Sequence, residues 1–150
     1  IWPNDLVIGG RKVCGILCEL GADETGVAWI VAGIGVNVHG VPPVADARWR
    51  PSAVSTAATP RRRHDIVCDV VTRLARRMDE WRDAGPGPAL AAFATRDLLD
   101  GRGVTVTVGD RDVVGTAAGI DGQGRLLVHS AAGPQALAAG EVTRVHHGLA

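Results

Sequence analysis

The apolar residues near the start of the chain occur in short runs separated by glycine and polar turns, a pattern typical of β-strands. We predict strands over Leu6–Ile8, Lys12–Leu20 and Val27–Val38. Gly9–Gly10 is a hairpin-type turn signal, and Gly21–Gly26 is a polar turn. Connections this short cannot hold the helix that a parallel crossover needs, so we expect the sheet to be antiparallel.

The middle of the chain changes from strand patterns to a loop and then to helical spacing. Residues Gly40–Arg63 are rich in proline, serine and threonine and predict a loop. From His64 to Arg82, apolar residues recur at alternating intervals of four and three, which predicts an amphipathic helix. A second helix is predicted over Ala89–Leu99, because Asp100–Gly101 is a stop signal.

The last third of the chain returns to short strands. Valine and threonine alternate from residue 104, as in a half-buried strand, and glycine-rich turns follow at short intervals. The predicted strands are Val104–Val108, Val113–Ile120, Leu126–His129, Ala136–Ala138 and Glu141–Val145. Strands this dense predict a small barrel. We therefore place a domain boundary near Gly101, between residues 1–100 and 101–150.

Composition narrows the class of protein. The chain has 150 residues, of which 46% are hydrophobic, enough to bury a core. Its 16 basic and 16 acidic residues balance, which argues against binding nucleic acid through bulk charge. The longest apolar run, Val27–Val36, is about half of a membrane span. Three cysteines without metal-site spacing suit a reducing cytoplasm, so we expect a cytoplasmic protein that does not enter a membrane.

Two details concern the origin of the chain and its chemistry. The first residue is Ile1 and the single methionine is Met78, so we expect this to be the C-terminal part of a longer protein. Lys12 is the single lysine among the 16 basic residues. Lysine and arginine are not interchangeable where a compact point charge is needed, which makes Lys12 a candidate functional residue.

Three sequence blocks carry the most specific signal. They are Trp2–Asp5 (WPND), Arg11–Glu19 (RKVCGILCE) and Gly33–Asn37 (GIGVN). Their order and spacing strongly resemble the WPND, K-x-x-GIL and GIGxN segments of bacterial biotin protein ligases. The region from Arg102 onward resembles the SH3-like C-terminal domain of that family.

The resemblance implies an α+β fold. It would combine a mixed or antiparallel sheet of a class II synthetase-like (biotin/lipoate ligase) catalytic domain, incomplete at its N-terminus, with a small SH3-like β-barrel. The implied activity of the full-length enzyme is ATP-dependent activation of biotin as biotinyl-AMP. Transfer then follows to a lysine of the biotin carboxyl carrier domain of acetyl-CoA carboxylase or a related carboxylase. The glycine- and arginine-rich loop of the family is expected upstream of residue 1, so we expect this chain alone to be inactive.

The resemblance also assigns a biotin site. Lys12 matches the family lysine that contacts biotin and the reacting phosphate, so it is the predicted catalytic residue and a biotin-binding residue. Gly15, Ile16 and Leu17 match the biotin-binding GIL segment. The residues are chemically suited to this task, because a point charge stabilises developing negative charge and a missing Cβ lets a flat ligand approach the backbone.

The predicted ATP and phosphate site contains Asn4, Asp5, Asn37 and Arg144. Of these, Asp5 and Asn37 carry the hard oxygen donors that Mg²⁺ prefers. The implied ligands of the enzyme are therefore ATP, Mg²⁺ and biotin, and a homodimer is possible. No helix-turn-helix pattern occurs, so no nucleic-acid partner is expected through this segment.

Each assignment has a structural alternative. In the alternative interpretation, Lys12 is a solvated lysine at a strand end, Gly15 is a bulge glycine, and Asn4–Asp5 are turn-formers after proline. Cys14 and Cys18 should share one face of a strand as buried small hydrophobes. At the level of function, the alternatives are a lipoate-type acyl-adenylating transferase and a truncated, non-catalytic binding module.

Overall fold

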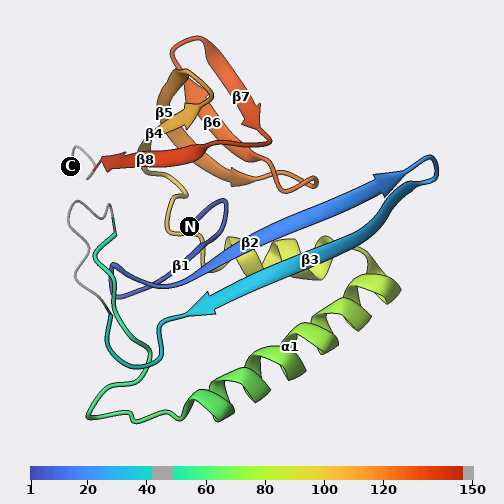
Figure 1. Cartoon of the computed structure of the whole chain (residues 1–150). Helices are drawn as coiled ribbons and strands as arrows, with labels where there is room; N and C mark the ends of the chain where they lie inside the picture. Colours follow the sequence, from blue (N-terminus) through green and yellow to red (C-terminus); the bar gives the residue numbers. More distant parts are fainter. Residues whose placement is uncertain (42–48, 147–150) are drawn as a thin grey trace. The chain divides into compact units, whose positions relative to one another are not determined.

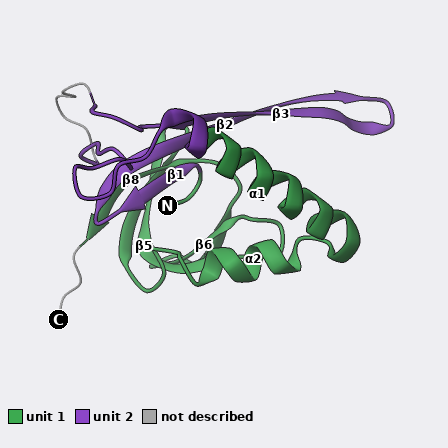
Figure 2. Ribbon diagram, turned by 90° about the horizontal axis from the view of Figure 1, so that it is seen from below, with its two compact units in different colours: residues 1–3, 67–150 green, residues 4–66 purple. Residues whose placement is uncertain are grey.

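The computed structural model describes residues 1–41 and 49–146, and part of the predicted 40–63 loop lies outside this description. Two compact units make up the chain, and each is treated by itself (Figure 2). One unit consists of residues 4–66; the other combines residues 1–3 with residues 67–150. Both contain antiparallel sheets, and helices complete the predicted α+β class. The domain boundary near Gly101 stays a prediction.

The unit of residues 4–66 is built on a three-stranded antiparallel sheet in the order β1-β2-β3 (Figure 1). Its strands are β1 (Asp5–Ile8), β2 (Arg11–Asp23) and β3 (Gly26–Val36). Gly9 and Gly10 both have positive φ, +56° and +73°, as the type I′ hairpin turn requires. The predicted hairpin and the predicted antiparallel order are therefore confirmed.

The turn between β2 and β3 is shorter than the predicted Gly21–Gly26 turn. At its tip the backbone N–H and the hydroxyl of Thr25 both donate to Asp23 Oδ1, at 2.8 and 2.6 Å. Gly21 stays in the strand opposite Trp29, whose indole fills the space that a Cβ on Gly21 would occupy. Residues 21–23, which were predicted as turn, therefore continue the β2–β3 ladder, because the Trp29 ring covers Gly21.

Strand β2 contains a bulge near its start. The pairing with β1 steps from Cys14 directly to Lys12, so Val13 is an extra residue on β2. Val13 and Cys14 are both buried, which shows that the bulge interrupts the alternation of faces. In a regular strand, Lys12 and Gly15 would point to opposite faces. With the extra residue they share one face.

The prediction that Cys14 and Cys18 are both buried is half right. Cys14 is buried, and Cys18 is exposed. Four residues of regular strand put both thiols on one face of β2. Sharing a face does not ensure burial, because Cys18 lies farther along the β2–β3 ribbon, beyond the bulge.

The helices follow the predicted order with one changed boundary. Helix α1 (Arg63–Ala84) matches the predicted amphipathic helix closely. Helix α2 (Gly87–Ala94) ends before the predicted Leu99. Thr95 donates its hydroxyl proton to the Ala92 carbonyl at this end. Leu99 is fully buried in the core of the C-terminal sheet, so tertiary packing draws the chain out of the helix.

The C-terminal strands form a five-stranded antiparallel sheet in the order β7-β6-β5-β4-β8. The strands are β4 (Gly103–Val108), β5 (Arg111–Ile120), β6 (Leu126–Ser130), β7 (Gly133–Leu137) and β8 (Glu141–His146). All five predicted strands are confirmed. Their inward residues are almost all apolar, and Val104, Val106, Leu126 and Val128 are fully buried.

Trp2 belongs to the core of this C-terminal unit. Its side chain is only 6% exposed and clusters with the buried residues of the sheet. The indole N–H donates to the carbonyl of Gly124, in the β5–β6 turn, at 3.1 Å. The Trp2–Asp5 motif is therefore divided: Trp2 packs in the core of the C-terminal sheet, and Asn4 and Asp5 belong to the other unit.

Neither described helix has the length and apolar character needed to cross a membrane.

Candidate functional site

An ion pair between Lys12 and Asp5 is the centre of the candidate site. The Lys12 ammonium lies 2.6 Å from Asp5 Oδ1, and the two side chains are 38% and 18% exposed. Asp5 begins β1 opposite Gly15, and the bulge turns Lys12 to the same face. The site therefore presents one cation and one carboxylate side by side, both reachable from solvent.

The backbone of Lys12 is fixed by a segment inside the predicted 40–63 loop. Its N–H donates to the carbonyl of Arg50 at 3.1 Å, and its carbonyl accepts from Ser52 N–H at 2.8 Å. Pro51 completes this short parallel bridge, while β1 pairs with the other edge of β2. Both backbone hydrogen-bonding groups of Lys12 are thus engaged by residues 50–52, and its flexible side chain stands on this fixed backbone.

Three glycines form a bare surface beside the ion pair, and we call Gly15, Gly33 and Gly35 the glycine floor. Gly15 lies directly opposite Gly35, and Gly33 lies opposite Leu17. A Cβ on Gly15 would lie 3.6 Å from Lys12 Nζ, and one on Gly35 would lie 3.8 Å from the Gly15 carbonyl oxygen. These are ordinary contacts, and none of the three glycines has a positive φ. Neither packing nor backbone conformation requires glycine at these three positions.

The predicted biotin-binding residues divide between the two faces of β2. Gly15 and Leu17 lie on the face of Lys12, and Leu17 is 64% exposed there. Ile16 points to the opposite face, and its N–H donates to the carbonyl of Asn4 at 2.8 Å. A role of Ile16 at the Lys12 face would therefore rest on its backbone. The function of all these residues stays a prediction.

The remaining predicted residues lie at different places. Asn37 follows β3 and so stands across β2 from Asp5; its N–H donates to Val13 O at 2.8 Å, and its side-chain amide donates to Lys12 O at 3.5 Å. Arg144 lies in the other unit, in β8 opposite Thr105. The structure thus brings Asp5 and Lys12 into contact, with Asn37 on the far edge of the same strand.

The donor set suits a metal that arrives with phosphates better than a metal held by protein alone. In residues 1–41 and 49–146, no group of three or more His, Cys, Asp or Glu side chains forms a metal site. Mg²⁺ is commonly held by one or two carboxylates, with phosphate oxygens and water completing its octahedron. The partly exposed carboxylate of Asp5 fits that arrangement.

The thiol of the neighbouring Cys14 is held in its protonated form by its surroundings. Burial raises the pKa of Cys14, the charge of Asp5 raises it further, and the charge of Lys12 lowers it. A protonated, buried thiol behaves as a small hydrophobe. This agrees with the structural role predicted for Cys14.

Sequence reasoning missed the parts of the site that depend on strand pairing. Gly33 and Gly35 were seen only as part of a motif, although their spacing of two already places them on one face. The bulge at Val13, which turns Lys12 toward the floor, has no clear signal in the sequence. Pairing with β1 creates it.

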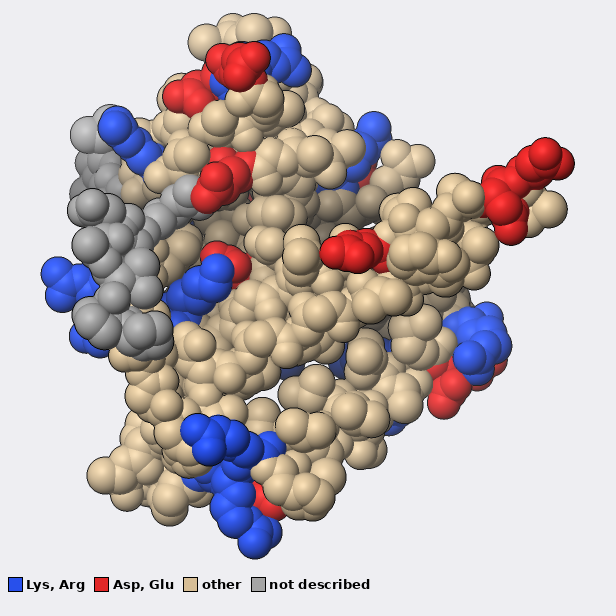
Figure 3. All heavy atoms as spheres, viewed as in Figure 1, with Lys and Arg blue, Asp and Glu red and all other residues tan. Residues whose placement is uncertain are grey.

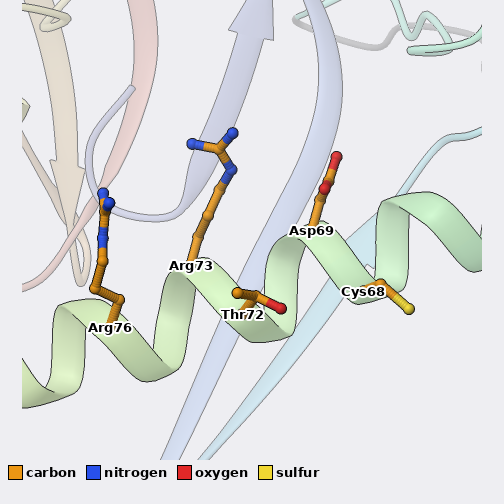
Figure 4. Close-up of a pocket in the computed structure, with 5 residues that line it drawn as sticks. All are labelled: Cys68, Asp69, Thr72, Arg73 and Arg76. Carbon is orange, nitrogen blue, oxygen red and sulfur yellow. The ribbon is translucent and has the colours of Figure 1, made fainter.

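Other surface features of the described residues are weaker candidates for a functional site than the Lys12 region. On the face shown in Figure 3, basic and acidic side chains are interspersed, and no broad basic surface forms there. A shallow hollow of about 320 Å³ lies along α1. Its described lining comes from that helix alone: Cys68, Asp69, Thr72, Arg73 and Arg76 (Figure 4). One helix does not enclose a ligand, so the Lys12 region remains the candidate site.

Comparison with known proteins points to one family. Residues 101–144 match the family described as "Biotin protein ligase C terminal domain". The chain is 35% identical over 150 aligned residues to a biotin--[acetyl-CoA-carboxylase] ligase of Mycobacterium tuberculosis, covering 96% of this chain and 52% of the relative. A Paracoccus denitrificans protein of the same name is 31% identical, with 94% and 60% covered.

A solved structure supports the fold. Biotin protein ligase from Aquifex aeolicus, in complex with biotin and ATP, superposes with a TM-score of 0.75 at 22% identity, covering 93% of this chain and 58% of that one. The chain spans between half and two thirds of the length of these relatives. Residues 101–144 therefore belong to the biotin protein ligase C-terminal domain family, and nearly the whole chain is similar to the C-terminal portion of such ligases.

Proposed function

We propose that this chain supplies the anion-binding half of an ATP-dependent biotin ligase. The whole protein would activate biotin as biotinyl-AMP and transfer it to a lysine on the biotin carboxyl carrier domain of acetyl-CoA carboxylase or a related carboxylase. The observation that carries the proposal is the Lys12–Asp5 pair beside the glycine floor. It occurs in a chain 35% identical to a biotin--[acetyl-CoA-carboxylase] ligase.

Lys12 is the proposed catalytic residue. Adenylation joins two anions, the biotin carboxylate and the α-phosphate, so the reaction needs positive charge where they meet. A point charge about 4 Å from an anion contributes roughly 4 kcal/mol at an effective dielectric near 20. The value is smaller for Lys12, which is 38% exposed and therefore partly screened by water. The part that grows as charge concentrates on phosphorus appears as rate.

The glycine floor is the proposed seat of the biotin rings. Gly15 and Gly35 lie opposite each other without side chains, so a flat bicyclic ligand can rest on the backbone there. The exposed side chain of Leu17 provides an apolar border on the same face. Lys12 stands directly beside this surface, where the carboxylate of a bound ligand would end.

Asp5 would hold Mg²⁺ with the phosphates of ATP, and we assign supporting roles at this end of the site to Asn4 and Asn37. Arg144, which belongs to the other unit, is assigned to ATP binding by the family resemblance alone. When bound, the metal supplies charge neutralisation for the phosphates. The chain's own contribution is to hold the carboxylate of Asp5 in place, through the pairing of β1 with β2. Asn4 contributes by the hydrogen bond that its carbonyl accepts from Ile16.

The finer features of the fold belong to the same proposal. We assign residues 1–100 to a class II synthetase-like catalytic domain and residues 101–150 to an SH3-like barrel. The remainder of the catalytic domain would come from sequence outside this chain, which alone would be inactive. We place the protein in the cytoplasm, and a homodimer is its proposed assembly.

The test is biotin-dependent pyrophosphate exchange in the whole protein. Lys12→Ala should lower biotinyl-AMP formation by about 10²-fold, the scale for losing one transition-state donor. Arg111→Gln removes one exposed basic charge from the other unit and should leave the rate unchanged. Undiminished activity in Lys12→Ala would refute the assignment of Lys12. Preference for lipoate in competition would identify the lipoate-type transferase, and absence of adenylation by the whole wild-type protein would identify the non-catalytic alternative.

A further inference from the structure

The backbone of Lys12 lies where the regular sheet ends. On one side, the register between β1 and β2 shifts at the bulge. On the other side, β3 ends at Val36, which pairs with Cys14, so the β2–β3 ladder stops two residues short of Lys12. A bulged strand is bent away from the regular ladder, so the direction of its side chains depends on the contacts that hold its backbone.

Residues 50–55, which we call the anchor segment, take over the pairing at this point. The carbonyl of Arg50 accepts the Lys12 N–H at 3.1 Å, and the N–H of Ser52 donates to the Lys12 carbonyl at 2.8 Å. Pro51, between them, forms the parallel bridge with Lys12. The anchor segment therefore occupies the position beside Lys12 that β3 would take if it were longer.

The anchor segment is itself tied to the chain that follows β3. The N–H of Val54 donates to the carbonyl of Asn37 at 2.8 Å, and the N–H of Ser55 donates to the carbonyl of Val38 at 3.0 Å. Four backbone hydrogen bonds thus join one short segment to Lys12 and to residues 37 and 38. Displacement of the segment would release Lys12 on its only side without a β1 partner.

We propose that the anchor segment positions the ammonium of Lys12, with the backbone N–H of Ser52 as the positioning group. The inference rests on the proposed function and deepens it, because it names what holds the proposed catalytic residue in place. The ammonium lies 2.6 Å from Asp5 Oδ1 at the end of a flexible four-carbon side chain. A fixed backbone limits the space that this side chain can reach. A misplacement of about 1 Å in an active site can cost 10²-fold in rate.

The test removes the Ser52 N–H and asks whether the effect passes through Lys12. Ser52→Pro eliminates this donor, and the extended bridge at Pro51 has the conformation that a following proline favours. Biotinyl-AMP formation by the whole protein should fall about 10- to 100-fold. Ser52→Ala is the matched control, because it removes the hydroxyl and keeps the N–H, and it should retain the wild-type rate.

A double-mutant cycle separates positioning from general damage. In a Lys12→Ala background, Ser52→Pro should change the remaining rate by no more than about twofold, because no ammonium is left to misplace. A purely structural defect would lower the rate by the same factor in both backgrounds. Circular dichroism verifies folding. If Ser52→Pro does not fold, a backbone ester at residue 52 replaces it, since the ester exchanges the N–H for oxygen and keeps the serine side chain.

A second measurement does not depend on activity. Lys12 is the single lysine of this chain, and acetic anhydride labelling followed by peptide mapping reports on its amine. An amine that leaves the contact with Asp5 is more open to the reagent. Ser52→Pro should therefore label Lys12 faster than wild type, and Ser52→Ala should label it at the wild-type rate.

The outcomes distinguish this inference from the proposed function. Equal losses of rate from Ser52→Pro in the wild-type and Lys12→Ala backgrounds would overturn the inference and leave the ligase proposal intact. A folded Ser52→Pro variant with wild-type rate and wild-type labelling would do the same. A wild-type protein without adenylation activity, whose Lys12 is labelled faster in Ser52→Pro and not in Ser52→Ala, would support the positioning role and defeat the ligase proposal.

Discussion

The ammonium of Lys12 lies 3.6 Å from the position that a Cβ on Gly15 would take. An added methyl group would therefore touch the lysine without displacing it and would stand on the glycine floor. Gly15→Ala should leave the free energy of unfolding unchanged or raise it slightly, because alanine restricts the unfolded chain. It should weaken biotin binding by at least about tenfold, since one misplaced methyl group costs 1–3 kcal/mol in a fitted site. Thermal unfolding and biotin titration of the same sample measure the two effects.

Gly122→Ala is the control for that variant. Gly122 has open space around its missing Cβ and no positive φ, and it lies in the β5–β6 turn away from the glycine floor in sequence and in unit. The free energy of unfolding of the Gly122→Ala variant should change by a similarly small amount, and its biotin affinity should stay at the wild-type value. Equal affinity in Gly15→Ala and Gly122→Ala would remove the glycine floor from the binding site.

Trp2 should contribute strongly to the stability of the C-terminal unit. It is 6% exposed within the core that surrounds Val104 and Leu126. Trp2→Ala should lower the free energy of unfolding by about 3–5 kcal/mol, the range for large aromatic truncations. Trp2→Phe retains most of the packing and loses the hydrogen bond to Gly124, so it should cost only part of that amount. Urea unfolding followed by circular dichroism measures both, and equal stability of all three proteins would contradict the buried placement.

Asp121 predicts a pH dependence of stability. The hydrogen bond from Arg125 is the main cause that lowers the pKa of Asp121, and the backbone N–H groups of Arg125 and Gln123 add to it. At pH values near and below 3.8, the ordinary pKa of an aspartate, the native state therefore binds fewer protons than the unfolded state. The stabilisation from Asp121 is fully present above that value and is lost as pH falls through the lowered pKa.

The test compares wild type with Asp121→Asn between pH 7 and pH 3. The variant should have the lower Tm at pH 7, and the difference should shrink as pH falls below about 4. Arg125→Met removes the same ion pair from the other side and should behave alike. A Tm difference that stays constant across the whole range would show that the carboxylate is not the source.

The two cysteines of β2 should differ in reactivity. Cys14 is buried and its pKa is raised by that burial, whereas Cys18 is exposed. Since the thiolate is the nucleophile, iodoacetamide at neutral pH should modify Cys18 at least about tenfold faster than Cys14. Peptide mapping by mass spectrometry resolves the two sites. Lys12→Met removes a charge that lowers the Cys14 pKa and should slow labelling of Cys14 further. Faster labelling of Cys14 in this variant would contradict the effect of the Lys12 charge.

Local patterns in the sequence predicted most of the fold. The Gly9–Gly10 turn, the amphipathic spacing of α1 and the alternating valines of β4 are signals carried by neighbouring residues, and the structure confirms each of them. The end of α2 was wrong, because Leu99 leaves the helical pattern to fill a core made by distant strands. The turn after β2 was too long, because its extent depends on Trp29 covering Gly21 across the hairpin.

The candidate site was predictable in its chemistry and only partly in its geometry. The motif resemblance identified Lys12, Asp5 and Gly15, and the structure brings these three together. Two features escaped prediction. The side chain of Trp2 packs in a unit other than that of Asp5, three positions away, and Val13 is unpaired in the β1 ladder. Both depend on contacts between segments, which no local pattern reports.

The extra residue at Val13 also makes the site sensitive to the length of the partner strand. A residue inserted in β1 between Leu6 and Val7 would pair with Val13 and remove the bulge. Lys12 would then lie three positions from Gly15 in a regular strand, and the ammonium would emerge on the side of the sheet away from Asp5. A homologue with one more residue between the aspartate and the lysine would therefore retain the written motif and lose the cation from its binding surface. Alignments of this family should treat that interval as having a fixed length.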